Sequence, residues 1–326
     1  MATLRTVTVK SSGGDYTSLS NAEAGEQGDL PTLDRQLDIE CYAFSDTTIV
    51  NITGWTTDAT RYIRIFTPIA ERHDGKWNDS KYKITQSSAY GFAITNLEEY
   101  VRLEGIQVRM SNTSTDGYGC ISSKPPGGAS SDVRVADCIC WSSTTSTSGT
   151  DGPAVACGGG NLLVRNSVII GGYRGASSAY NVATPSLTLH NVTVVNSNDI
   201  GIETGTSIYI TATNVYVGGT GGESYGGSGS SFSKTTCMHS TATTFSGSTK
   251  SIAYSTANFT NVTASSEDLH LVSGSALIGA GTDLSGTFTT DIDGETRSAW
   301  DVGADEYISV AEPISVFRGS PMRMRM

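Results

Sequence analysis

The sequence predicts an all-β fold in which short parallel strands stack as the coils of a solenoid. Between residues 101 and 217 one pattern occurs five times: a short strand with alternating apolar residues, a two-residue corner and a second alternating strand. The corners recur after about 23 to 32 residues, and a drifting period of this size is typical of solenoids whose turns carry variable loops. No helical pattern separates the strands, which excludes βαβ units and leaves a coil of strands stacked about 4.8 Å apart.

The corner positions form one column when the five segments are aligned. The column holds Gly105, Asp137, Asn166, Asn191 and Asn214. Asn tolerates the left-handed backbone conformation of a tight corner, and its amide can hydrogen-bond to the equivalent residue in the next coil. We therefore predict a structural ladder of Asp137, Asn166, Asn191 and Asn214.

This pattern resembles the right-handed parallel β-helix family, which includes pectate-lyase-like enzymes and the tailspike and decoration proteins of bacteriophages. The resemblance covers roughly residues 35 to 307. The Gly-Gly-Asp-Tyr turn at residues 13–16 and the strand at residues 61–68 are similar to those of phage-encoded β-helix proteins. The resemblance implies a right-handed single-stranded parallel β-helix, and because this fold carries many activities it leaves the function open.

The chain divides into a cap, a β-helix and an arm. Residues 1–34 are predicted to form an N-terminal cap, with a strand and a short helix that starts near Ser18 and hides the edge of the first coil. Residues 35–307 form the β-helix, and His73 is expected to lie in a solvated charged loop. Residues 308–326 form an extended C-terminal arm with three arginines; such tails are usually disordered, and the alternative is that the arm orders against an acidic partner or a neighbouring subunit. Its proposed partner-binding residues are Phe317, Arg318, Arg323 and Arg325.

The segment from Thr290 to Tyr307 resembles the closing signature of many β-helix proteins, with an Asp-x-Asp-Gly turn, an Arg and an Asp-x-Gly-Ala-x-Glu-Tyr strand. We interpret its acidic residues and Arg297 as a structural turn with internal ion pairs. A calcium loop would require more oxygen ligands than this segment offers.

Composition and charge exclude several classes of protein. The 326 residues carry a net charge of −11, which argues against nucleic acid as a partner because phosphate contacts need Lys and Arg. No apolar run approaches a membrane span, and Met1–Arg5 lacks the apolar core of a signal peptide. We therefore expect no membrane contact and synthesis in a host cytoplasm, with secretion as the alternative.

The six cysteines are too scattered for a metal site. Cys138 and Cys140 fall at inward positions, so we expect small buried thiols. A disulfide between Cys120 and Cys157 is the less favoured alternative. No zinc, P-loop, dinucleotide or Ser-His-Asp pattern occurs, so no metal and no cofactor is predicted.

A second group of apolar residues points away from the coil interior. In each second strand the residues beside the inward positions form a continuous outward row. The row contains Ile139, Trp141, Val168, Ile170, Val195 and Tyr216. Large exposed apolar faces mark interfaces. We therefore predict that the row is an interface between the subunits of a homotrimer, whereas cover by one of the chain's own loops is the alternative.

An enzymatic alternative depends on carboxylates at strand starts. Asp116 and Asp151 are expected one coil apart, Asp199 lies about two coils further, and Glu203 points to the same side as Asp199. Paired acids at such separations are used by glycosidases. Asp before Gly at the start of a strand is also an ordinary turn residue, so stacked turns produce the same row without catalysis.

Together these observations favour a non-enzymatic virion surface protein, a homotrimeric capsid decoration (cement) protein of a bacteriophage that mounts on the major capsid protein or another virion protein. The alternative is a polysaccharide lyase, a glycoside hydrolase or a glycan-binding tailspike that uses Asp116, Asp151, Asp199 and Glu203 on a surface glycan. The outward row and the basic arm support the first hypothesis, and the row of acids supports the second.

Overall fold

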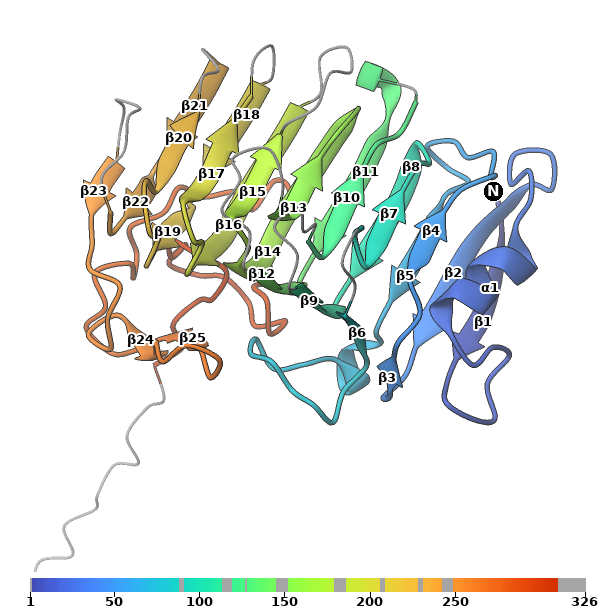
Figure 1. The fold of residues 1–326 in the computed structure, drawn as a ribbon, viewed down its shortest axis with the longest axis horizontal. Coiled ribbons are helices and arrows are strands. Elements are labelled where there is room, and N and C mark those ends of the chain that lie inside the picture. The colour runs from blue at the N-terminus through green and yellow to red at the C-terminus, as the bar shows by residue number, and fades with distance from the viewer. Residues whose placement is uncertain are drawn as a thin grey trace, which may run out of the picture.

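The strands stack in parallel register along one axis, with the N-terminus at one end and the C-terminal strands at the other (Figure 1). The computed structural model describes residues 2–87, 91–112, 119–126, 128–144, 152–178, 186–205, 209–227, 231–241 and 249–309. Successive coils pair residue for residue, as in β14 with β16, where Leu162 faces Leu187 and Ile169 faces Val194. The predicted right-handed parallel β-helix is confirmed.

The coils place their strands in three stacks. The first stack contains β1 (Thr3–Val9), β2 (Arg35–Cys41), β5 (Ile63–Phe66), β8 (Tyr100–Glu104), β11 (Asp132–Ala136), β14 (Asn161–Gly171), β16 (Ser186–Val195), β18 (Tyr209–Thr213) and β21 (Ser231–Thr235). The second contains β3 (Ser45–Asp46), β6 (Lys83–Ser87), β9 (Gln107–Asn112), β12 (Ile139–Thr144), the later halves of β14 and β16, β19 (Tyr216–Gly218), β22 (Cys237–His239) and β23 (Thr249–Ser251). The third contains β4 (Val50–Ile52), β7 (Ile94–Asn96), β10 (Ile121–Ser123), β13 (Pro153–Cys157), β15 (Arg174–Ser178), β17 (Ile200–Thr204) and β20 (Tyr225–Gly227). Outside the stacks lie α1 (Leu19–Glu26), η1 (Ile69–Glu71), η2 (Gly128–Ser130) and the antiparallel pair β24 (Phe259–Asn261) and β25 (Asp268–Leu271).

The first and second stacks meet at the predicted ladder. Asp137, Asn166, Asn191 and Asn214 have φ of 53°, 45°, 51° and 57°. The left-handed conformation is open to Asn and Asp because their short polar side chains bond locally. Asn214 Nδ2 donates to Asn191 Oδ1 at 3.1 Å, which links two successive coils.

The coil interior is a narrow column of aliphatic side chains and thiols. All six cysteines are buried and free. Ile121 pairs with Val155 and Ser123 pairs with Cys157, so Cys120 and Cys157 occupy different register positions on neighbouring coils. The predicted small buried thiols are therefore present, and the alternative disulfide is wrong.

The chain's first residues cover the open end of the first coil. Ser18 caps α1, its Oγ accepting from the Asn21 N–H at 3.2 Å. The buried carboxylate of Glu23 on the same helix accepts from Trp55 Nε1 at 2.9 Å. This bond holds the helix against the β-helix, and β1 pairs along its whole length with β2. None of the described helices is long and apolar enough to span a membrane.

The prediction that the outward row faces sister subunits is corrected. The row forms a second hydrophobic cluster with the chain's own C-terminal segment, residues 252–307, which runs back along the coils (Figure 1). Trp141, the most exposed member, is only 9% exposed. The covering side chains are Phe259, Leu269, Leu271, Leu277, Ile292 and Val302. The weaker alternative, cover by the chain itself, describes the molecule.

The C-terminal segment docks on the ladder through the Asn amides. Asn166 Nδ2 donates to Thr290 O at 2.7 Å, and Asn191 Nδ2 donates to Asp301 O at 2.8 Å. Asn214 exchanges two bonds with Thr282, since its Nδ2 donates to the carbonyl and its Oδ1 accepts from the N–H. The ladder therefore stabilises each corner and also fixes the returning segment.

The closing segment is a buried polar network, as the sequence suggests. Arg297 and Glu306 form an ion pair of 3.4 Å whose side chains are both fully buried. Glu306 also accepts from the N–H groups of Ser298, Ala299, Trp300 and Asp301. Asp291 Oδ1 accepts from the N–H groups of residues 293 and 295. These bonds make the acidic turn a structural element.

Candidate functional site

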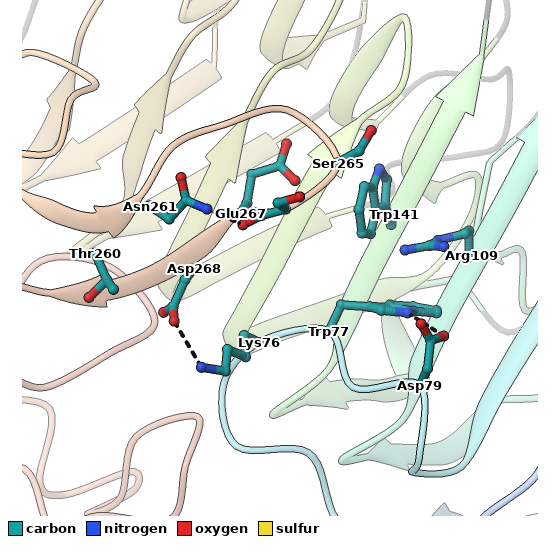
Figure 2. Close-up of a pocket in the computed structure, with 11 residues that line it drawn as sticks. Lys76, Trp77, Asp79, Arg109, Trp141, Thr260, Asn261, Ser265, Glu267 and Asp268 are labelled. Atoms are coloured by element: carbon teal, nitrogen blue, oxygen red, sulfur yellow. Dashed lines mark hydrogen bonds and ion pairs between the residues drawn. The ribbon is translucent and has the colours of Figure 1, made fainter.

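Two adjoining hollows lie where the C-terminal segment meets the second strand stack. Their volumes are about 550 and 270 Å³, and they share Trp141, Ser265 and Glu267. One wall is the segment of residues 260–268, and the opposite wall is the loop of residues 76–79 (Figure 2). We call the two hollows together the groove.

Two tryptophans and an arginine form one side of the groove. Trp77 and Trp141 meet edge to face, with ring centroids 5.8 Å apart. The Arg109 guanidinium lies 4.1 Å from the Trp77 ring centroid and 3.9 Å from that of Trp141. β9 and β12 place this arginine directly opposite Trp141 in register.

Arg109 forms no ion pair with any residue that the structure describes. Burial lowers the pKa of Arg109, and the nearby charges of Asp79 and Glu267 oppose that effect. Among the described residues no carboxylate lies within ion-pairing distance of it, and its Nε is buried without a hydrogen-bond partner. An anionic group in the groove would meet a preformed positive site.

Glu267 lies where the two hollows join. It is only 7% exposed. Its Oε1 accepts from Asn196 Nδ2 at 2.7 Å, whereas its Oε2 is buried and has no hydrogen-bond partner in the described structure. An unsatisfied buried carboxylate oxygen is costly, so it marks a position where a ligand group is expected.

The neighbouring carboxylate, Asp268, already has cationic partners. It pairs with Lys76 at 3.0 Å and with His270 Nδ1. Burial alone would raise the pKa of Asp268, but the hydrogen bonds from His270 and Lys76 outweigh it and hold the pKa well below its usual value. Asp268 therefore stays ionised and positions the groove wall, while Glu267 keeps a free oxygen.

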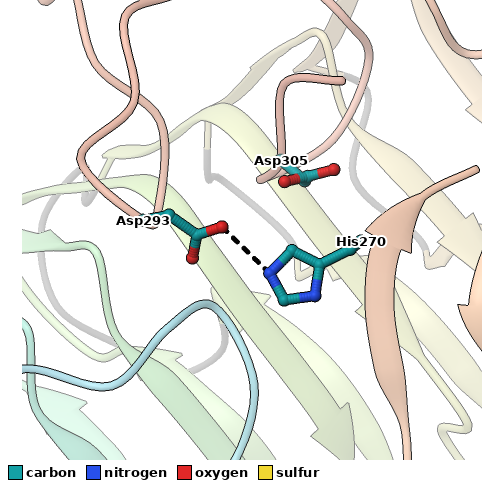
Figure 3. A group of neighbouring side chains, drawn as sticks. All are labelled: His270, Asp293 and Asp305. Atoms are coloured by element: carbon teal, nitrogen blue, oxygen red, sulfur yellow. Dashed lines mark hydrogen bonds and ion pairs between the residues drawn. The ribbon is translucent and has the colours of Figure 1, made fainter. Parts of the chain in front are cut away.

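His270 connects the groove wall to the closing segment. Its Nε2 bonds to Asp293 Oδ2 at 2.9 Å, and Asp305 lies beside them (Figure 3). Burial would lower the pKa of His270, but hydrogen bonds to Asp268 and Asp293 raise it to about 11. Burial raises the pKa of Asp305 to about 8.

Neither of the two predicted catalytic acids that the structure describes, Asp199 and Glu203, lines the groove. Asp116 and Asp151 lie outside the described residues. Glu203, on β17 of the third stack, forms an ion pair with Arg174 at 2.6 Å. Asp199 precedes the same strand and hydrogen-bonds to Tyr173. No residue that lines the groove belongs to the third stack.

Two further predictions concern other parts of the chain. The arm residues Phe317, Arg318, Arg323 and Arg325 lie outside the described residues. His73 is not in a solvated loop: it is 3% exposed, and its Nε2 lies 2.9 Å from Asp137 O. The loop folds onto the ladder, so the sequence prediction for His73 is wrong.

Glu267 and Trp77 are groove residues that the sequence alone did not single out. Glu267 directly precedes the short strand β25, and Trp77 stands in a charged loop. The one available signal was a tryptophan in an otherwise polar loop, since aromatic side chains in such positions often cover a binding surface.

No protein-family model matches the chain, and no curated protein matches it. Among solved structures it is similar to the pectate lyase Pel9A, with 12% identity, 94% of this chain and 97% of that chain covered, and a TM-score of 0.35. The protein is a parallel β-helix protein by its own strand pairing, and the phage branch of the expected resemblance stays a prediction.

Proposed function

We propose that this protein binds a polysaccharide in the groove and cleaves it with Glu267 as the proton-transferring group. The observation that carries the proposal is the free buried oxygen of Glu267 at the junction of two hollows, beside a tryptophan pair. Binding sites commonly combine an apolar aromatic surface with a few convergent polar groups.

The aromatic side of the groove suits a sugar chain. Pyranose rings have apolar C–H faces that pack against indole rings, and their hydroxyls need hydrogen-bonding groups around the rim. Asn261, Ser265 and Asn196 line the groove and offer such groups. Arg109 favours a sugar that carries a carboxylate, because no carboxylate of the described residues forms an ion pair with it.

Chemistry at a glycosidic bond needs a proton donor or acceptor close to the cleaved bond. Glu267 fits this role because one oxygen is fixed by Asn196 while the other is free. Asp79 offers a second carboxylate on the opposite wall, where Trp77 Nε1 donates to it at 3.0 Å. Two carboxylates that flank the sugar are the usual requirement for hydrolysis, and Arg109 could stabilise the charge that develops in an elimination.

The test is a panel of neutral and uronate-containing polysaccharides incubated with the full chain. Reducing ends would report hydrolysis, and absorbance of unsaturated sugar products would report elimination. Glu267→Gln is expected to lower the rate by about 10²–10⁴-fold while binding persists. Trp77→Ala is expected to weaken binding by about tenfold or more. Tyr209→Ala, at a residue that is 57% exposed on β18 outside the groove, is the control and should change neither.

The absence of binding across the panel, or full activity in Glu267→Gln, would refute the proposal. Binding without cleavage would refute the enzymatic half and leave a glycan-binding protein.

The virion hypothesis has lost the observation that favoured it. The outward row is covered by residues 252–307 of the same chain, and the basic arm lies outside the described residues. Homotrimer formation and attachment to a virion protein stay predictions, which mass determination with and without the last dozen residues would test.

A further inference from the structure

We propose that His270, Asp293 and Asp305 form a binding site for a divalent transition-metal ion of the Zn²⁺ or Mn²⁺ type. The site lies outside the groove, and nothing in the proposed sugar chemistry depends on it. The proposal therefore stands or falls independently of the proposed function.

The three side chains converge from three separate parts of the closing region. His270 is on β25, and Asp293 is in the Asp-x-Asp-Gly turn. Asp305 is in the Asp-x-Gly-Ala-x-Glu-Tyr sequence that ends at Tyr307 (Figure 3). One ligand atom from each lies within 4.8 Å of the others, and His270 Nε2 is 2.9 Å from Asp293 Oδ2. Neighbouring ligand atoms around an ion with bonds of about 2.1 Å lie about 3 Å apart, so little movement is needed to admit the ion.

Two carboxylate oxygens in this group lack partners. Asp305 is 6% exposed, and only one of its oxygens takes a hydrogen bond in the described structure, from the Leu271 N–H at 2.6 Å. Asp293 Oδ1 is buried and has no hydrogen-bond partner. Asp305 is buried and Asp293 is partly buried, and carboxylate oxygens without hydrogen-bond partners are costly in such surroundings, so a bound cation removes that cost.

The imidazole is oriented for binding through Nε2. Its Nδ1 is held by Asp268, which is held in turn by Lys76 at 3.0 Å. A carboxylate on the second ring nitrogen is the usual arrangement around a metal-binding histidine, because it fixes the tautomer and the ring orientation. The remaining nitrogen, Nε2, faces Asp293, and an ion bound there replaces the proton through which Nε2 bonds to this carboxylate.

The three side chains face a hollow on one side and the backbone of Gly75 on the other. A hollow of about 260 Å³ is lined by the three side chains together with Glu295, Glu306, Tyr307 and neighbouring residues, so water can complete the coordination. On the closed side the backbone of Gly75 comes close: a Cβ at this residue would lie 2.2 Å from Asp293 Oδ1. The missing side chain keeps the carboxylate free of a clash.

The donor set decides the class of ion. One imidazole nitrogen and two carboxylate groups suit Zn²⁺ and Mn²⁺, whereas Ca²⁺ requires six to eight oxygen ligands and Mg²⁺ prefers oxygen and water alone. We therefore expect binding of Zn²⁺ and Mn²⁺ with little response to Ca²⁺.

The test is calorimetric titration of the EDTA-dialysed full chain with Zn²⁺, Mn²⁺ and Ca²⁺. We expect one equivalent of Zn²⁺, an affinity at least tenfold weaker in Asp305→Asn, and a change within twofold in Glu295→Gln. The second variant is the matched control, because Glu295 lines the same hollow without belonging to the group. Absence of stoichiometric Zn²⁺ binding, or equal affinity in wild type and Asp305→Asn, would overturn the proposal.

A second measurement uses the wild-type chain, so it does not depend on whether a variant folds. Substoichiometric Mn²⁺ should broaden the imidazole NMR signal of His270 most strongly among the four histidines of the chain, and that of His73 next, because His73 Nδ1 accepts from the Gly75 N–H beside the site. Broadening of all four signals alike, or of none, would also overturn it.

Discussion

The buried histidine next to the ladder should make the protein less stable in mild acid. His73 follows η1 in the loop that folds onto the ladder, and it is 3% exposed. Its Nε2 lies 2.9 Å from Asp137 O, and its Nδ1 accepts from the Gly75 N–H at 3.2 Å. A ring that donates with one nitrogen and accepts with the other is neutral.

The size of the effect follows from the shift in pKa. Burial, with a smaller contribution from the charge of Arg72, lowers the pKa of His73 from 6.5 to about 4, although Asp293 and Asp74 act in the opposite direction. Above pH 6.5 the ring is neutral in both the folded and the unfolded chain. As the pH falls, the unfolded chain takes up the proton first. The free energy of unfolding therefore decreases by about 2 kcal/mol at pH 5 and by at most about 3.4 kcal/mol below pH 4.

Two measurements check this prediction. An NMR titration of the four imidazole signals should show one, assigned with His73→Gln, that does not titrate above pH 5. The Gln amide can keep both hydrogen bonds but cannot take up a proton, so denaturant unfolding of His73→Gln should lose about 2 kcal/mol less than wild type between pH 7 and pH 5. A His73 signal that titrates near pH 6.5, or an identical loss in the variant, would refute the reasoning.

Two further predictions concern the closing segment and the ladder. Arg297→Met should lower the free energy of unfolding by about 3–5 kcal/mol, because it leaves Glu306 buried without its cation; Arg134→Met, at an exposed ion pair with Asp132, is the control and should cost less than about 1 kcal/mol in the same denaturant titration. Asn191→Ala should cost about 1–2 kcal/mol more than Asn191→Gly, because both lose the amide bonds but only Gly accepts φ of 51° freely. Equal costs for the two Asn191 variants would show that the corner backbone is not under this constraint.

The coil could be predicted from sequence because its causes are local. Alternating apolar residues decide which side chains enter the interior, and a left-handed corner selects Asn, Asp or Gly within one or two residues. The positive φ of Asn166 and Asn214 follows from the corner itself. These features need no knowledge of distant parts of the chain.

The cover of the outward row could not be predicted because its causes are distant. The row is visible as apolar residues on the wrong side of each strand, but the same pattern serves a sister subunit or a returning segment equally well. The returning residues, such as Leu277 and Ile292, are separated from Trp141 by more than a hundred positions. Both residues lie in turns, and the segment around them contains no repeat that would predict where it docks.

The candidate site was missed for the same reason. Glu267 and Trp77 lie far apart in the sequence, and only the fold brings them together in the groove. The acids that the sequence singled out were visible because they begin strands, yet Glu203 is neutralised by Arg174 across two neighbouring coils. A carboxylate is available for chemistry only if its surroundings leave it unpaired, and a sequence does not show those surroundings.

The residue type at each position of the corner column suits the group that contacts it there. Gly105 stands where the Arg72 side chain crosses the corner, and a Cβ there would lie 2.1 Å from Arg72 Nε. The next member, Asp137, receives the Arg72 guanidinium at 2.9 Å. The column therefore has a carboxylate, Asp137, at the position that the Arg72 cation contacts.

The Asn members stand where the C-terminal segment presents its carbonyl groups, to which an amide can donate and a carboxylate cannot. Because that segment also carries Glu267 and Asp268 to the groove wall, the ladder positions the candidate site as well as the coils. A ladder variant that loosens the segment should therefore weaken sugar binding before the β-helix itself unfolds.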